Sequence, residues 1–243
     1  MRDCLLDLVQ HTHDLGCIDL VKIVGDENTT QIEGLAEDLS VVVKGEYKNP
    51  VPDFVGTFGM PNLNKLDLHL KCPEYKEGAS IEVVTQQRNG EDIPTGLHFE
   101  NAFGDFKNDY RFMNAEIINE QMKTVKFKGA SWNIEFEPTV ASIQKLKYQA
   151  AAHTEETTFQ VTTKDDNLIF SFGDATTHSG NFVFQAGVTG KLKQTWAWPV
   201  SQVQSILNLS GDCTMRISDA GALQITVNSG LAEYNYILPA QAK

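Results

Sequence analysis

The stretch Pro138-Thr-Val-Ala-Ser-Ile-Gln-Lys-Leu-Lys-Tyr-Gln-Ala-Ala-Ala152 is the segment from which the fold can be worked out. Pro138 and Thr139 suit a helix start, because proline lacks only an amide hydrogen that has no intrahelical partner there. Apolar residues then recur at helical spacing and predict one apolar stripe: Val140, Ile143, Leu146 and Ala150. Lys145 falls nearly opposite this stripe and Lys147 lies at its edge, so we expect both ammonium groups to reach solvent.

A long β-rich stretch follows this helix, and then come a second short helix and more strand. Helical spacing predicts the other helices over residues 2–14, 60–70 and 199–209. Strand-like runs between turn residues predict strands over 17–24, 29–35, 39–43, 53–58, 79–86, 96–102, 106–113, 132–136, 157–163, 168–173, 181–185, 191–197, 214–218, 223–227 and 233–238. These elements together indicate an α+β fold.

The two halves of the chain repeat the same order of elements. Each half has a longer helix, hairpin strands, a short helix opened by proline and further strands. Each short helix ends in Leu-x-Leu, at Leu68-His-Leu70 and at Leu207-Asn-Leu209. The order predicts domains over 1–113 and 132–243, joined by a lysine-rich connector over 114–131 that is strand-like at 124–127. Coincidence among common β-hairpins is the alternative.

The charge and the hydrophobic pattern of the chain argue against several classes of function. The 243 residues include 20 lysines and arginines against 32 acidic residues, which gives a net charge of −12. This balance argues against nucleic-acid binding over the whole surface but leaves room for a small basic surface inside an acidic shell. No apolar run is long enough to span a bilayer, and the early aspartates argue against a secretory leader, so we expect a cytoplasmic protein without a membrane partner.

The cysteines and the polar clusters give no sign of a catalytic or metal centre. Four scattered cysteines without a CxxC pair are expected to be reduced thiols: Cys4, Cys17, Cys72 and Cys213. His11 and His13 are two residues apart, which points them to different faces of a helix and argues against a metal pair. Asp174, His178 and Ser179 suggest a hydrolase, but no GxSxG motif occurs and a polar hairpin tip explains them better. We therefore expect no catalytic residue, no metal site and no cofactor.

Two segments of the second half resemble DNA polymerase sliding clamps. One is the hairpin Asn167-Leu-Ile-Phe-Ser-Phe-Gly-Asp-Ala-Thr-Thr-His-Ser-Gly-Asn-Phe-Val-Phe184. The other is the ending Glu233-Tyr-Asn-Tyr-Ile-Leu-Pro-Ala240, which is similar to the terminal strand and proline-containing tail of proliferating cell nuclear antigen. In length and repeat order the chain resembles the clamps of tailed bacteriophages more closely, which would place it in the cytoplasm of a host cell.

The resemblance implies two sliding-clamp domains per subunit, each with sheets outside and two helices on the inner face. It further implies a homotrimeric ring that encircles duplex DNA without sequence preference and tethers the replicative DNA polymerase. Such a ring is opened by a clamp loader and has no catalytic activity. A few lysines facing phosphates would give weak, salt-dependent contacts that leave sliding free.

By position in the matching helices, the resemblance implies five DNA-facing residues in the bore: Lys65, Lys145, Lys147, Gln202 and Gln204. Their alternative role is that of ordinary solvated side chains. It also implies a partner groove where the connector meets the C-terminal tail, lined by Ile117, Ile118, Met122, Val125, Leu238 and Pro239. The alternative for these six is that they only seal the two domains together.

Two features depart from the clamp pattern. The first helix is expected to turn Asp3 and Asp7 outward, where a bore helix should be neutral or basic. No strand precedes this helix, whereas the strand over 132–136 precedes the helix of the second half. The first domain is therefore expected to be shortened, or the ring to be built differently there.

Other hypotheses remain open at this point, and the hydrolase that would use Asp174, His178 and Ser179 is one of them. A β-rich structural or carbohydrate-binding virion protein would cluster Trp132, Trp196 and Trp198 on an exposed face. A monomeric processivity factor would be a variant of the clamp.

Overall fold

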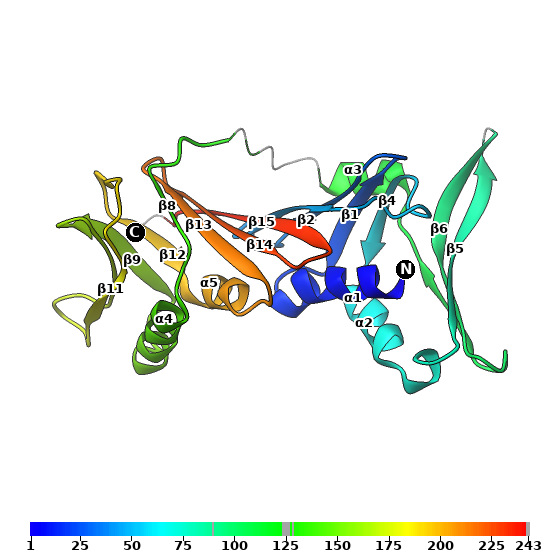
Figure 1. Cartoon of the computed structure of the whole chain (residues 1–243), viewed down its shortest axis with the longest axis horizontal. Helices are drawn as coiled ribbons and strands as arrows, with labels where there is room; N and C mark the ends of the chain where they lie inside the picture. The colour runs from blue at the N-terminus through cyan, green and yellow to red at the C-terminus, as the bar shows by residue number, and fades with distance from the viewer. Residues whose placement is uncertain (89, 123–126, 128, 242–243) are drawn as a thin grey trace. The chain divides into compact units, whose positions relative to one another are not determined.

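The computed structural model describes residues 1–88, 90–122, 127 and 129–241 (Figure 1). The chain separates into two compact units, of which unit 1 comprises Met1–Lys126 and Ser229–Tyr234 and unit 2 comprises Phe127–Asn228 and Asn235–Lys243. The change of unit at residue 126 falls inside the connector expected over 114–131, and the domain limits 1–113 and 132–243 stay predictions. Of the strand expected over 124–127, all but residue 127 lies outside the described residues.

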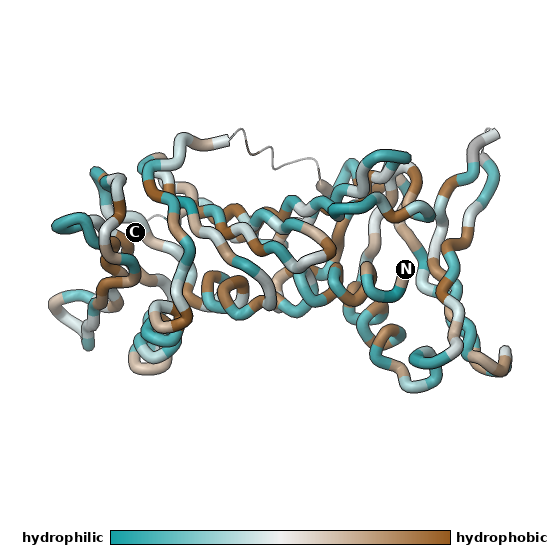
Figure 2. Tube along the Cα trace, in the orientation of Figure 1, coloured by the Kyte–Doolittle hydropathy of each residue, from teal (hydrophilic) through white to brown (hydrophobic). Residues whose placement is uncertain are grey.

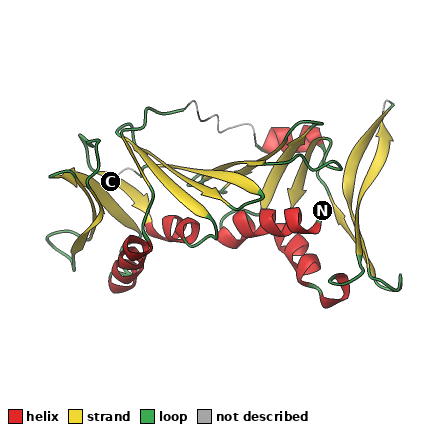
Figure 3. Cartoon of the chain, in the orientation of Figure 1, coloured by secondary structure: helices red, strands yellow, loops and turns green. Residues whose placement is uncertain are grey.

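Within the described residues, unit 1 contains two antiparallel sheets and three α-helices. Its elements are α1 (Arg2–His11), the 3-10 turn η1 (His13–Leu15), β1 (Leu20–Gly25), β2 (Thr30–Leu35), β3 (Val42–Tyr47), β4 (Gly56–Pro61), α2 (Leu63–Lys71), the 3-10 turn η2 (Pro73–Tyr75), β5 (Ser80–Arg88), β6 (Glu91–Glu100), β7 (Lys107–Arg111) and α3 (Ala115–Gln121). Strand order is β4-β1-β2-β3 in one sheet and β5-β6-β7 in the other. Helices α1 and α2 contact each other and lie on one side of the first sheet (Figure 3).

Unit 2 repeats this plan. Its elements are β8 (Ile134–Phe136), α4 (Val140–Ala152), β9 (Thr158–Lys164), β10 (Asn167–Phe172), β11 (Gly180–Ala186), β12 (Trp196–Pro199), α5 (Val200–Leu207), β13 (Asp212–Ser218), β14 (Ala222–Asn228) and β15 (Ala232–Pro239). The strands are ordered β11-β10-β9-β12 and β15-β14-β13-β8, and the first residues of β15 count with unit 1. Helices α4 and α5 contact each other, as α1 and α2 do.

The helices expected from spacing are present, and their apolar faces form much of the core. Hydrophobic and hydrophilic residues alternate along them in Figure 2. The buried apolar side chains are Leu5, Leu8 and Val9 in α1, Leu63, Leu66 and Leu70 in α2, and Val200, Val203, Ile206 and Leu207 in α5. All four cysteines are free thiols, as expected, and burial raises the pKa of Cys213 to about 12.

The apolar stripe expected on α4 is only partly correct. Leu146 is fully buried, but Val140 is 76% exposed. Ser142 is buried instead, and its hydroxyl donates a 2.6 Å hydrogen bond to the carbonyl of Phe184 in β11. The small side chain of Ser142 lets the helix approach β11 closely, and its hydroxyl satisfies a strand carbonyl. The buried face of α4 is therefore formed by Ser142 and Leu146, and Val140 lies outside it.

Several segments also differ from expectation, among them the helix expected over 60–70, since Met60 and Pro61 belong to β4 and α2 begins at Leu63. Lys44 and Gly45 do not end the strand expected over 39–43 but lie inside β3. Glycine is needed there because an added Cβ would lie 2.9 Å from the ring of Tyr234. The strand expected over 191–197 is largely loop, and β12 begins at Trp196. The connector begins with helix α3, which the sequence analysis did not predict.

The outward orientation expected for Asp7 is wrong. Asp7 is 8% exposed, and its Oδ2 accepts a 2.8 Å hydrogen bond from the hydroxyl of Tyr234. The ring of His11 stacks on the ring of Tyr234 with centroids 4.7 Å apart, and its Nδ1 lies 3.3 Å from Asp7 Oδ1. A buried carboxylate needs such partners to offset its lost hydration. Asp3 is exposed, as expected.

Replacing Asp7 by alanine is expected to destabilise the protein by about 2 kcal/mol, because the buried Tyr234 hydroxyl would lose its hydrogen bond to a carboxylate. Chemical denaturation followed by circular dichroism measures this change. Asp3→Ala, on the exposed side of the same helix, is the matched control and should cost about 0.5 kcal/mol or less. Equal losses in the two variants would contradict the buried role of Asp7.

Candidate nucleic-acid interface and partner pocket

Helices α4 and α5 form a pair without any acidic side chain. The side chain of Thr139 accepts a hydrogen bond from the amide of Ser142 and so fixes the start of α4. Lys145 is exposed and Lys147 is partly exposed on this helix, in agreement with the helical spacing. Gln202 and Gln204 lie on α5, both partly exposed, and α5 carries no charged residue. The pair therefore presents lysines and amides to solvent.

The helix pair of unit 1 neutralises most of its acidic groups internally. Lys65 is exposed on α2, whereas the carboxylate of Asp67 is largely buried and lies 2.6 Å from the ammonium group of Lys71. The Arg2 guanidinium donates to the carbonyls of Leu70 and Tyr75. These carbonyls lie at the C-terminal end of α2 and in the turn after it, where a cation is favourable.

The four helices α1, α2, α4 and α5 carry more basic than acidic residues, whereas the whole chain is negatively charged. Helices α1, α2, α4 and α5 together carry five lysines and arginines and three aspartates, of which Asp7 and Asp67 are buried. Within the described residues, Lys65, Lys145 and Lys147 form no salt bridge. Their charges are therefore available to an external anion, although the protein carries a net charge of −12.

The surroundings of α2 also shift the pKa of His69. Partial burial lowers the pKa of this imidazole, and the nearby charge of Lys65 lowers it further. Both causes favour the neutral form of the ring.

The connector residues expected to line a partner groove have different surroundings. Ile118 is fully buried on α3, and its side chain covers Gly59 in β4, where an added Cβ would lie 2.9 Å from Ile118 Cδ1. Ile117 is 46% exposed beside it, and its amide donates to the side chain of Asn114. Val125 lies outside the described residues.

The C-terminal residues of the same prediction lie in unit 2. Leu238 is fully buried, and its carbonyl accepts a 3.1 Å hydrogen bond from the indole Nε1 of Trp198. Pro239 is exposed at the end of β15. Two of the six expected groove residues, Ile118 and Leu238, are thus core residues of their units.

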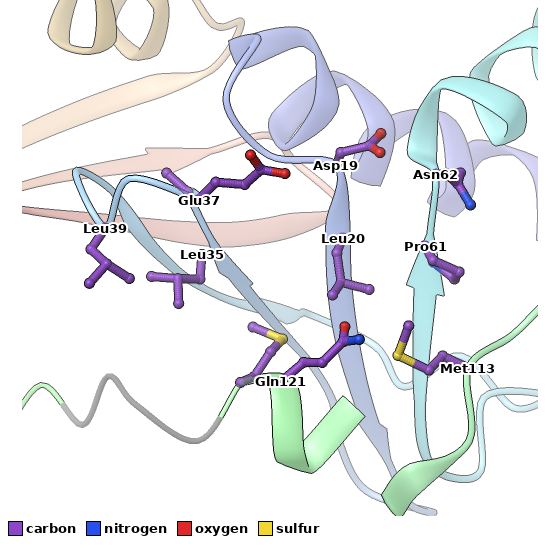
Figure 4. A pocket seen from close by; sticks show the side chains of 11 residues that line it. Asp19, Leu20, Leu35, Glu37, Leu39, Pro61, Asn62, Met113 and Gln121 are labelled. Atoms are coloured by element: carbon purple, nitrogen blue, oxygen red, sulfur yellow. The ribbon is translucent and has the colours of Figure 1, made fainter. Parts of the chain in front are cut away.

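Met122 lines a pocket of about 440 Å³ beside α3 (Figure 4). The lining residues are Asp19, Leu20, Leu35, Ala36, Glu37, Leu39, Pro61, Asn62, Met113, Gln121 and Met122. Leu39 is 50% exposed and has a positive φ of 60° at the β2–β3 turn, which turns an apolar side chain toward solvent. Of these lining residues the sequence alone indicates only Met122, because the pocket joins the ends of strands whose pairing the sequence does not give.

Other candidate sites are not supported by the geometry. Asp174 Oδ1 accepts hydrogen bonds of 2.7 Å from the amide and the hydroxyl of Thr176, as in an exposed turn. Trp198 is fully buried, so the exposed cluster of three tryptophans that a carbohydrate-binding protein would need is not formed. Within the described parts of the chain there is no cluster of three or more potential metal ligands. None of the helices described is long and apolar enough to cross a membrane.

Comparison with known proteins decides the fold. No family model and no curated protein sequence matches the chain. Among solved structures, the chain is similar to A. fulgidus PCNA, determined with the C-terminal region of FEN-1 bound, with a TM-score of 0.70 and 11% identity over 98% of this chain and 96% of that one. The chain has the fold of a PCNA-type sliding clamp.

Two further clamps agree with this result. PCNA from Thermococcus kodakaraensis matches with a TM-score of 0.66 and 10% identity, over 98% of this chain and 97% of that one. Proliferating cellular nuclear antigen from Entamoeba histolytica matches with a TM-score of 0.65 and 10% identity, over 99% of this chain and 94% of that one. The sliding-clamp fold expected from the sequence is therefore confirmed over nearly the whole chain.

Removing the charge of Lys65 is expected to raise the pKa of His69, because one of the two causes that lower it is removed. The pKa should stay below that of a solvated histidine, because partial burial remains. An NMR titration of the His69 ring in Lys65→Met measures the change. Lys44→Met, on a strand of the same unit, is the control, and an equal pKa in both variants would contradict the proximity of a free charge at Lys65.

Proposed function

We propose that the protein is a sliding clamp that encircles duplex DNA and tethers a replicative DNA polymerase, without catalytic activity. The observation that carries the proposal is the acid-free helix pair α4 and α5, with exposed lysines, in a chain of net charge −12. The clamp fold supports it, since this fold occurs in PCNA structures that match nearly the whole chain.

The DNA contact in this proposal is electrostatic and weak. Lys65, Lys145 and Lys147 face phosphates, and Gln202 and Gln204 supply neutral donors and acceptors along the same path. Phosphate contacts carry no sequence information, so the clamp holds any duplex. A closed ring holds DNA by topology, which allows each contact to be weak enough for sliding. The acidic remainder of the surface repels DNA from other faces.

The ring in this proposal is a homotrimer closed through strand edges. In the described sheets, β7 is the last strand of β5-β6-β7 and β11 is the first strand of β11-β10-β9-β12. Pairing of β7 with β11 of the next copy would satisfy both edges and close a head-to-tail ring. Val183 on β11 is 38% exposed in the single chain, and the next subunit would cover it.

Polymerase and clamp loader would dock at the pocket beside α3. Leu39, Met122 and Ile117 offer partly exposed apolar side chains for hydrophobic anchors of a partner peptide. Tethering raises the effective concentration of the polymerase at the primer end. We place this activity in the cytoplasm, in a host cell if the protein belongs to a tailed bacteriophage.

The solution mass is expected to be three times the chain mass of 27.0 kDa. Light scattering at several micromolar concentrations measures it, because a head-to-tail ring closes only at one subunit number. Val183→Lys, placed on the proposed edge, should shift the mass toward that of one chain. A wild-type protein that stays monomeric across the range would contradict the stable trimer.

Removing the three helix lysines is expected to weaken duplex DNA binding and its salt dependence. The slope of log K against log[salt] should fall by roughly 0.9 for each phosphate that the variant no longer neutralises. Fluorescence anisotropy with a labelled duplex compares Lys65→Gln/Lys145→Gln/Lys147→Gln with Lys44→Gln/Lys48→Gln/Lys193→Gln, which changes the net charge equally at other exposed sites. Equal weakening in the two triple variants would reject the helix pairs as the DNA-facing surface.

The function itself is tested by primer extension on circular primed DNA, with the replicative polymerase and the clamp loader from the same source. The wild-type clamp should increase the length of the products that the polymerase makes in one binding event. The Lys65→Gln/Lys145→Gln/Lys147→Gln variant should increase this length by a smaller amount. Unchanged product length with the wild-type protein would overturn the proposed function.

A further inference from the structure

Unit 1 contains a second groove, of about 750 Å³, which shares no lining residue with the pocket beside α3. It lies between the loop that leads into β4, the first residues of β4, the β5–β6 hairpin and Ala115 at the start of α3. Val55, Val83 and Ile93 give it an apolar lining together with Pro52 and Pro94. Val55 is 52% exposed, so a large apolar side chain faces this groove without cover.

The backbone of β4 is open toward the same groove. Gly59 exchanges two hydrogen bonds with Met113, its amide donating at 2.9 Å and its carbonyl accepting at 2.8 Å. Since alternate residues of a strand direct their N–H and C=O groups to the same edge, those of Thr57 also point away from β1. Beyond Met113 the chain turns into α3 at Ala115, so no neighbouring strand continues alongside Thr57 in the described residues.

The charged side chains that line the groove are all acidic. Asp53 and Asp92 are exposed and line it, and among the described lining residues there is no lysine, arginine or histidine. The wall opposite β4 is shaped by a β-bulge in the β5–β6 pairing, where the register shifts between Val84 and Thr85 of β5 and Thr95 of β6 is the extra residue. Bulges re-aim side chains and occur preferentially next to binding sites.

We propose that this groove binds an extended segment of a partner protein, which adds to β4 as a short strand at Thr57. The segment carries alternate apolar residues, which contact Val55, Val83 and Ile93, and at least one lysine or arginine, which pairs with Asp53 or Asp92. Backbone hydrogen bonds from an open strand edge give affinity, and pockets for alternate side chains give specificity. The groove shares no lining residue with the pocket beside α3, so two partners can bind one subunit together.

The probe is a library of random heptapeptides displayed on phage and selected on the full-length protein. We expect enriched sequences that alternate apolar residues with lysine or arginine. The synthetic form of an enriched peptide should shift the amide resonances of Val55, Thr57 and Ile93. Methylating those peptide amides that would face Thr57 should abolish binding, whereas methylating the amides of the other edge should not.

Charge reversal tests the recognition independently. Asp53→Lys/Asp92→Lys should weaken binding of the enriched peptide about tenfold, and Glu27→Lys/Glu77→Lys, which changes two exposed acids elsewhere, should leave it unchanged. Thermal melting of each variant confirms that it is folded. Enrichment of no peptide, binding confined to the pocket beside α3, or equal affinities of the two charge variants would overturn the proposal.

A second copy of this chain is the remaining occupant to exclude. If Val55→Asp lowers the solution mass of the protein, the groove is an interface between copies and the proposed partner segment is wrong. An unchanged mass, together with loss of peptide binding in Val55→Asp, supports the proposal. Neither result depends on DNA binding or processivity, so the groove can fail while the proposed clamp function stands.

Discussion

The hydrogen bond between the Tyr234 hydroxyl and Asp7 is the interaction on which unit 1 depends most directly. It places the side chain of a C-terminal strand against the first helix, where the His11 ring covers its other face. The same tyrosine ring leaves space only for glycine at position 45 in β3. Helix, strand and aromatic ring therefore fix one another, and a buried carboxylate is tolerated because its partners are held in position. This arrangement holds α1 on the sheet and leaves α2 free to present Lys65.

Charge separation is the second organising feature. A protein with 32 acidic and 20 basic residues could not leave its helices positive unless carboxylates were kept off them or neutralised. Unit 2 does the former, since α4 and α5 contain no acid. Unit 1 does the latter by burying Asp7 and pairing Asp67 with Lys71. Two different solutions reach the same electrostatic result, which explains how the helices can differ in sequence between the halves.

The sequence was sufficient for the fold class and for the repeated order of elements, because α2 and α5 carry apolar residues at strict helical spacing. It was also sufficient for the clamp fold, although the solved clamps share only 10–11% identity with the chain. It was insufficient where a polar residue is buried, as at Ser142 and Asp7, because spacing alone cannot reveal a distant partner. Helix α3 was missed because its cap, Asn114, lies in a segment without apolar periodicity. The pocket beside α3 was missed because it depends on which strand ends meet.

The bond between Asp7 and Tyr234 joins residues 227 positions apart in the chain. During synthesis the first helix and the β1–β4 sheet leave the ribosome long before the strand that completes their core. Until then the face of β3 at Gly45 lacks its tyrosine, and Asp7 can remain hydrated. Unit 1 therefore reaches its final packing only after Tyr234 has been made, and closing so long a loop makes this step slow compared with local helix formation. The synthesis of β15 thus determines when the first residues become stably folded.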